Sequence, residues 1–108
     1  MQPMKKFKKY ESQIQTEIIK FLKERDWDVS ATHGTSLMVG FPDLYACHSK
    51  FGVRWIEVKE PNEGRLTQSQ RERFMKWASC NVGIWIMTAA TEFEYRCLFT
   101  PPNWHQWL

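Results

Sequence analysis

The sequence predicts an α/β domain in which helices flank a mixed central sheet, in the element order α-β-β-β-α-β. Three observations predict it. Apolar residues recur with a helical period over residues 13–25, β-branched and aromatic residues concentrate at 43–48, 53–59 and 82–87, and a helix-start signal at Thr67 separates the last two of these runs. A strand, a helix and a further strand in that order predict a right-handed crossover between parallel strands.

The N-terminal segment predicts a basic lead-in followed by a helix. Residues 1–12 carry four lysines around Phe7, and we expect a solvated end there, with phosphate contact as the alternative. From Ser12 or Gln13 to about Arg25, an apolar stripe at i, i+4, i+7 and i+8 predicts a helix that faces the core. The stripe consists of Ile14, Ile18, Phe21 and Leu22.

Three strands are expected next. Residues 26–28 break the helix, and residues 29–32 can form a short first strand. The runs at 43–48 and 53–59 predict an antiparallel hairpin, because the segment between them contains Gly52 and reads as a turn.

A second helix and a buried strand follow the hairpin. Thr67 with Gln70 three residues later has the spacing of a capping box. The helix is expected to run to about Ala78, to bury Phe74, Trp77 and Ala78, and to end at Asn81. Residues 82–87 are almost continuously apolar, which is typical of a strand at the centre of a sheet with both faces covered.

The C-terminal segment predicts one more strand and a short helical turn. Aromatic and polar residues alternate over residues 93–99, which is the period of a strand. Residues 104–108 can form one turn that docks Trp104 and Trp107, either within the chain or against a second chain.

Length and composition indicate a single domain over residues 1–108, with a lead-in at 1–12, a core at 13–87 and a tail at 88–108. The net charge of +3 is compatible with a polyanionic partner. Three scattered cysteines without a CxxC pair argue against a zinc site or a disulfide framework. We expect a cytoplasmic protein that has no signal peptide, no membrane span and no small-molecule cofactor.

Two acidic residues and a lysine are expected on one face of the hairpin. Glu57 and Lys59 stand two residues apart in a strand, so they share a face, and Asp43 on the neighbouring strand can reach it. Buried charges in a sheet are costly unless they are paired or bind a metal. Two carboxylates beside a lysine suit Mg²⁺-assisted phosphodiester hydrolysis, because Mg²⁺ prefers oxygen ligands and activates a bound water.

These residues also resemble a known family. Gly40-Phe41-Pro42-Asp43-Leu44, then Glu57-Val58-Lys59, then Leu66-Thr67-Gln68-Ser69-Gln70 resemble the ordered motifs of the PD-(D/E)XK nucleases, and in particular the VRR-NUC branch, over about residues 14–87. The resemblance implies a restriction-endonuclease-like core. It also implies that Asp43, Glu57 and the carbonyl of Val58 bind Mg²⁺, with Mn²⁺ as a substitute.

The resemblance implies further roles for three residues. Lys59 would act on the attacking water or the transition-state charge, and Gln70 would steady Lys59 or a metal-bound water. Glu17 would supply the acidic group of the first helix, with Glu11 and Glu24 as alternatives. Simpler interpretations remain open: Gln70 as a capping residue only, Asp43 as the cap of the proline turn, and Glu57 with Lys59 as a surface pair.

Residues near these motifs are candidates for contact with DNA. We expect phosphate contacts from His33, Ser36, Lys50, Arg65 and Arg71, which would give affinity without sequence specificity.

The expected function is that of a homodimeric, Mg²⁺-dependent endonuclease acting on branched DNA, with the Holliday junction as the first candidate. This expectation follows from the resemblance, and a phage gene in a bacterial cytoplasm would suit so small a protein. Two alternatives are a flap or single-strand DNA nuclease in a repair complex and a nucleic-acid-binding module without catalysis.

Overall fold

The computed structural model describes residues 3–32, 36–62 and 64–108, with the side chains of residues 3–9 and 36 outside that description. In these residues the order of the main elements is α1 (Pro3–Lys23), β1 (Asp28–Ala31), β2 (Leu44–His48), β3 (Gly52–Val58), α2 (Gln68–Ser79), β4 (Ile84–Met87) and α3 (Glu92–Arg96). Short 3₁₀ turns at Ser36–Met38, Cys97–Phe99 and Trp104–Trp107 complete the described chain. The predicted order α-β-β-β-α-β is therefore present up to β4.

The four strands form one mixed sheet in the order β1-β2-β3-β4. β1 and β3 both pair with β2 in antiparallel fashion, and β4 pairs with β3 in parallel. The predicted hairpin and the predicted parallel pairing are confirmed. The prediction that residues 82–87 occupy the sheet centre is wrong, because β4 is an edge strand.

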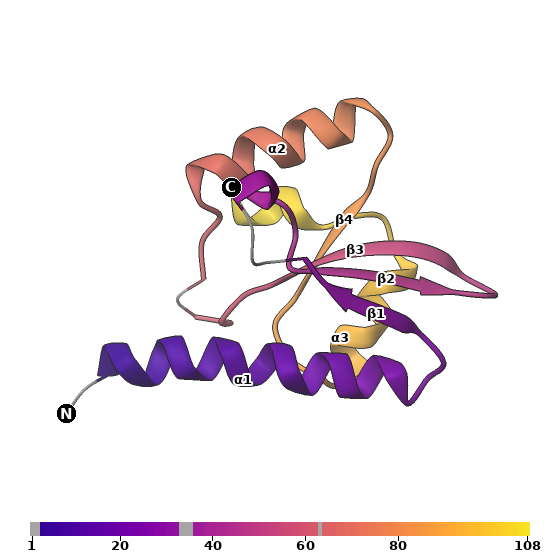
Figure 1. Cartoon of the computed structure of the whole chain (residues 1–108), viewed down its shortest axis with the longest axis horizontal. Helices are drawn as coiled ribbons and strands as arrows, with labels where there is room; N and C mark the ends of the chain where they lie inside the picture. Colours follow the sequence, from indigo (N-terminus) through magenta and orange to yellow (C-terminus); the bar gives the residue numbers. More distant parts are fainter. Residues whose placement is uncertain (1–2, 33–35, 63) are drawn as a thin grey trace.

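Helices cover both faces of this sheet (Figure 1). On one face, α1 and the segment around α3 pack against Ile56, Val58 and Met87. On the other face, α2 and the C-terminal turn pack against Ile84 and Ile86. Alternate residues of β4 thus enter opposite cores, which explains its near-continuous apolar sequence.

α1 is longer than the sequence predicted. It begins at Pro3, so residues 3–12 belong to the helix and not to a separate lead-in. Proline is well tolerated in the first helical turn, where its missing N–H has no intrahelical role. Ile14, Ile18 and Leu22 are buried in the core as predicted, and Asp26, with a positive φ of 70°, ends the helix.

α2 begins as predicted and differs in its buried face. Thr67 is its N-cap, and the capping box with Gln70 is present. Phe74 is buried and Trp77 is half-buried, but Ala78 is exposed, contrary to the prediction. The chain leaves the helix through Asn81, whose φ is 65°.

The segment at residues 93–99 is helical, so the predicted strand is wrong. Thr91 caps α3 by accepting a hydrogen bond from the backbone N–H of Glu94. Tyr95 and Leu98, three residues apart, face the core, while Phe93 is 79% exposed. The buried residues of this segment therefore follow the spacing of a helix, although its sequence alternates with the period of a strand.

The C-terminal turn docks on its own chain. Trp104 is buried and its ring lies 6.0 Å from that of Phe74, and Trp107 packs against the same cluster. None of the described helices is both long and apolar enough to cross a membrane.

Candidate active site

Two carboxylates meet at the open end of the β2–β3 hairpin. Leu44 pairs with Ile56, so the next positions along the ladder bring Asp43 opposite Glu57. The N–H of Asp43 donates to Glu57 Oε1 (3.2 Å), and the N–H of Val58 donates to Asp43 Oδ2 (2.9 Å). Each carboxylate is therefore held by a backbone group of the opposite strand, which fixes their separation through the sheet itself.

The loop before β2 positions Asp43 through tight packing. Gly40 has a φ of 82°, and a Cβ at this position would lie 2.8 Å from the carbonyl oxygen of Ser69 on α2. A side chain would thus clash with the α2 backbone in a conformation that L residues rarely adopt. The hydroxyl of Thr32 donates to the carbonyl of Pro42, and its N–H donates to the carbonyl of Asp43 (2.9 Å).

Burial and mutual repulsion disfavour the charged forms of both acids. Glu57 is 2% exposed, and desolvation followed by the negative charge of Asp43 raises its pKa to about 8. Desolvation also raises the pKa of Asp43, although the N–H of Val58 and the ammonium of Lys59 act in the opposite direction. A site of this kind gains free energy from an added cation.

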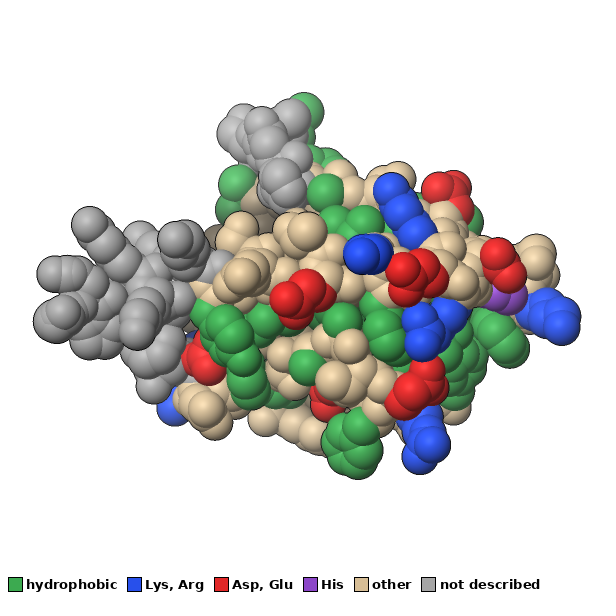
Figure 2. Space-filling model, turned by 90° about the horizontal axis from the view of Figure 1, so that it is seen from below, with side chains coloured by type: hydrophobic (Ala, Val, Ile, Leu, Met, Phe, Trp, Pro, Cys, Tyr) green, Lys and Arg blue, Asp and Glu red, His purple; other side chains and the backbone are tan. Residues whose placement is uncertain are grey.

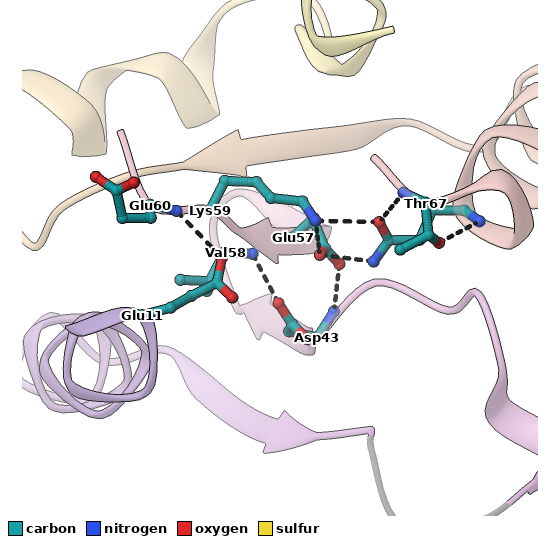
Figure 3. A network of polar contacts seen from close by, with 8 residues as sticks. Glu11, Asp43, Glu57, Val58, Lys59, Glu60 and Thr67 are labelled. Atoms are coloured by element: carbon teal, nitrogen blue, oxygen red, sulfur yellow. Dashed lines mark hydrogen bonds and ion pairs between the residues drawn. The ribbon is translucent and has the colours of Figure 1, made fainter. Parts of the chain in front are cut away.

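Lys59 and Gln70 complete a polar network around Glu57, and Figure 3 labels Lys59, Glu57 and Thr67 in it. The Lys59 ammonium lies 3.3 Å from Glu57 Oε2 and donates to Gln70 Oε1 (3.1 Å). Gln70 Nε2 donates to Glu57 Oε2 (2.7 Å), and Gln70 Oε1 also accepts the N–H of Thr67 (3.0 Å). Gln70 therefore caps α2 and contacts Lys59 and Glu57 at the same time, so it is not a capping residue only.

Glu11 is the acidic residue that α1 brings to this site. It lines, with Asp43, Glu57, Lys59 and Gln70, a cleft of about 680 Å³ between α1 and the hairpin. Its Oε2 accepts the N–H of Glu60 (3.1 Å), which ties it to the segment after β3. Glu17, the residue expected here from the sequence, is exposed and does not line the cleft, so Glu11 and not Glu17 is the acidic residue of α1 at this site.

A signal for Glu11 was available in the sequence. Glu11, Ile14 and Ile18 follow i, i+3 and i+7, so Glu11 continues the buried stripe by one turn toward the N-terminus. Placing the helix start at residue 12 or 13 left this turn out. Because α1 extends back to Pro3, Glu11 lies well inside the helix.

The donor set suits a hard divalent cation. Asp43 and Glu57 supply carboxylate oxygens, and Asp43 Oδ1 accepts no hydrogen bond from the described residues. A strand residue points its N–H and C=O to the same side, so the Val58 carbonyl lies on the side of Asp43. No group of three or more His, Cys, Asp or Glu side chains within the described ranges could by itself hold an ion. Mg²⁺ commonly takes only one or two protein carboxylates and keeps several waters.

The predicted DNA-contacting residues differ in their distance from this cleft. Arg65 and Arg71 are exposed and flank Thr67 and Gln70 in the sequence. Lys50 is in the turn beyond His48, and His48 is already about 17 Å along the strand from Asp43. His33 and the side chain of Ser36 lie outside the described residues. Among the side chains coloured in Figure 2, acidic and basic groups are interspersed along the α1 face.

Comparison with known proteins gives no assignment. The chain matches no protein-family model, and neither a curated protein nor a solved structure matches it.

Proposed function

We propose that this protein is a metal-dependent endonuclease of the PD-(D/E)XK type, close to the VRR-NUC branch, with a restriction-endonuclease-like core. The observation that carries the proposal is the approach of Asp43 and Glu57, on neighbouring strands, to Lys59 and Gln70 in one cleft. The mixed sheet and the order α1-β1-β2-β3-α2-β4 support the same proposal.

Asp43, Glu57 and the Val58 carbonyl would hold the Mg²⁺, with Glu11 reaching it directly or through water. A bound Mg²⁺ lowers the pKa of a water and offsets charge on the phosphate. Mn²⁺ has similar ligand preferences and is expected to substitute for it.

Lys59 is positioned to act on the attacking water or on the developing negative charge. An ammonium has three donors. Two of them are engaged by Glu57 and Gln70, which leaves one for the cleft. Gln70 fixes this orientation, because its own amide is held by the N-terminus of α2 and by Glu57.

The proposed substrate is branched DNA, with a four-way junction as the first candidate, cut by a homodimer. A domain of 108 residues leaves little surface beyond the cleft for reading a base sequence. Two sites related by a two-fold axis match the two strands that a resolvase must cut.

The test is a cleavage assay on a four-way junction, a flap, single-stranded DNA and a linear duplex, with Mg²⁺, Mn²⁺ or EDTA. We expect cleavage of the junction with either metal and none in EDTA. Preferential cleavage of the flap or the single strand would instead favour the alternative nuclease, and DNA binding without any cleavage would favour the non-catalytic module.

Matched variants test the site itself. Asp43→Ala is expected to abolish cleavage, and Lys59→Ala to lower kcat by about 100- to 1,000-fold, the usual effect of removing a group that stabilises transition-state charge. Glu24→Gln, at an exposed position on the turn after α1, is the control and should cleave at the wild-type rate. Wild-type cleavage by Asp43→Ala would disprove the site.

A further inference from the structure

Four aromatic side chains form a connected cluster on the α2 face of the hairpin. The ring of Trp55 lies 4.7 Å from that of Tyr45, 4.8 Å from Trp77 and 6.3 Å from Phe41. The rings of Phe41 and Trp77 are 5.0 Å apart. All four side chains are only partly buried, so this aromatic cluster (Phe41, Tyr45, Trp55 and Trp77) is not sealed inside the core.

The aromatic cluster is continuous with the catalytic carboxylates. Tyr45 follows Asp43 by two residues, and Trp55 precedes Glu57 by two residues, so each ring shares a sheet face with one carboxylate. The step between such neighbours is about 7 Å. A nucleotide whose phosphate lies at the carboxylates can therefore place its base on these rings.

The side of Tyr45 that faces away from Trp55, here called its open side, lies toward β1, the edge strand of the sheet. Its partner on β1 is Ser30, whose small side chain is exposed. The Tyr45 hydroxyl has no hydrogen-bond partner in the part of the chain that the structure describes, and no buried side-chain oxygen there lacks one, so the hydroxyl reaches solvent. The hydroxyl of Tyr95, by contrast, accepts the indole N–H of Trp27 (3.0 Å) in the interior.

We propose that the open side of Tyr45 stacks an unpaired nucleobase beside the scissile phosphate. This inference rests on the proposed nuclease function and narrows its substrate to DNA that presents a nucleobase outside the duplex stack at the cut, as a flap does directly and a four-way junction does when the base pair at its crossover opens. Aromatic rings stack against any base, so this contact distinguishes an unpaired base from a paired one but does not distinguish one base sequence from another. A base inside a continuous duplex is covered on both faces by its neighbouring bases and cannot stack on Tyr45.

A cation stands at the rim of the same cluster. The Arg73 guanidinium lies 4.6 Å from the centre of the Phe41 ring, and its Nε donates to the carbonyl of Val39 (3.0 Å). Its terminal nitrogens have no hydrogen-bond partner in the described segments, so they are available to a phosphate next to the stacked base.

The test uses a flap oligonucleotide whose unpaired nucleotide at the branch is 2-aminopurine, with a fully paired duplex of the same sequence as the control. Binding is measured in Ca²⁺, with strand integrity checked on a denaturing gel. Tyr45→Leu keeps apolar contact with Trp55 but removes the ring, and Tyr45→Phe keeps the ring. Phe93→Leu removes an exposed aromatic side chain on α3 and is the matched control.

Stacking on Tyr45 predicts that the wild type, Tyr45→Phe and Phe93→Leu quench 2-aminopurine fluorescence on binding. Tyr45→Leu should lose the quenching and bind the flap about tenfold more weakly. All four proteins should bind the paired duplex equally. Unchanged flap binding by Tyr45→Leu, or an equal loss on the paired duplex, overturns the inference.

Two further measurements keep the result interpretable. Ser30→Leu fills the open side of Tyr45 from an exposed position and should weaken flap binding even if Tyr45→Leu does not fold. Binding and quenching do not require cleavage. Quenching in Ca²⁺ with no cleavage in Mg²⁺ or Mn²⁺ would therefore refute only the nuclease proposal, and Mg²⁺-dependent cleavage with an unchanged KM in Tyr45→Leu would refute only the stacking.

Discussion

At the scale of single residues, Glu57 combines low exposure, a neighbouring acid and a raised pKa. A protein without a metal must either protonate this carboxyl or tolerate a buried charge beside Asp43. Either choice raises the free energy of the folded state only, because the unfolded chain leaves both acids in water. Stability should therefore depend on pH in a direction that the raised pKa determines.

We predict that the metal-free protein loses stability as pH rises from about 4.5 to about 8. In this window the folded state keeps a proton on Glu57 that the unfolded state has released, so the free energy of unfolding falls with pH. Glu57→Gln removes this titration and should flatten the profile while abolishing cleavage. Urea unfolding in EDTA at several pH values measures the slope. An equal slope in wild type and Glu57→Gln would show that Glu57 is not its source.

We predict that Glu11, and not Glu17, contributes to metal binding. Mg²⁺ or Mn²⁺ should raise the melting temperature of the wild type, because a ligand that binds only the folded state stabilises it. Glu11→Gln should reduce this rise, while Glu17→Gln, on the same helix but outside the cleft, should keep it. Equal shifts in both variants would remove Glu11 from the metal site.

The sequence was informative about this site to different degrees. Asp43, Glu57 and Lys59 could be grouped from the sequence because side chains alternate strictly between the two faces of a strand. Residues two positions apart therefore lie on the same face. Periodicity places Glu11 on the buried face of α1, but it does not show that Glu11 reaches the two carboxylates. Periodicity gives the face of a helix but not its position along the sheet, and that position brings Glu11 to the hairpin end.

At the scale of elements, the outer edge of β4 is closed by a side chain. The N–H of Ile86 donates to Asn103 Oδ1 (2.7 Å), and Asn103 Nδ2 donates to the carbonyl of Ile86 (3.3 Å). One amide thus replaces the two hydrogen bonds of a fifth strand. An apolar strand that ends a sheet would otherwise invite pairing with another chain.

We predict that Asn103→Ala lowers the free energy of unfolding by about 1–3 kcal/mol, because it leaves the backbone N–H of Ile86 without a partner and the Ile86 carbonyl with only the weak donor Cys97 Sγ (3.7 Å). Asn62→Ala, at an exposed position, is the control and should have little effect. Urea denaturation measures both, and light scattering should detect more aggregation for Asn103→Ala. Equal stability of the two variants would show that Asn103 does not protect the edge.

The elements that the sequence predicted well have local signals, and the others depend on tertiary context. The capping box at Thr67 and the hairpin are local features, and both are present. The position of β4 at the edge depends on the absence of a further strand. No further strand follows in the described chain because the residues expected to form it are helical in α3. The N-cap at Thr91 favours this helix more strongly than the alternating sequence favours a strand.

At the scale of the whole molecule, the proposed junction cleavage requires two active sites. We predict a solution mass of twice 13.0 kDa and paired, symmetric cuts in a four-way junction. Size-exclusion chromatography with light scattering gives the mass, and mapping of the cut strands gives the symmetry. A monomer that makes single cuts would contradict the resolvase assignment while leaving the metal site intact.

The turn that joins β2 and β3 lies at the opposite end of the hairpin from both acids, beyond the pair His48 and Gly52. Residues added there in matched pairs would lengthen both strands without moving Asp43 relative to Glu57. The fourteen positions that separate the acids along the chain therefore reflect hairpin length and not chemical need. Relatives with longer tips would keep the same site, and the tip offers a place to attach a fluorophore or an affinity tag.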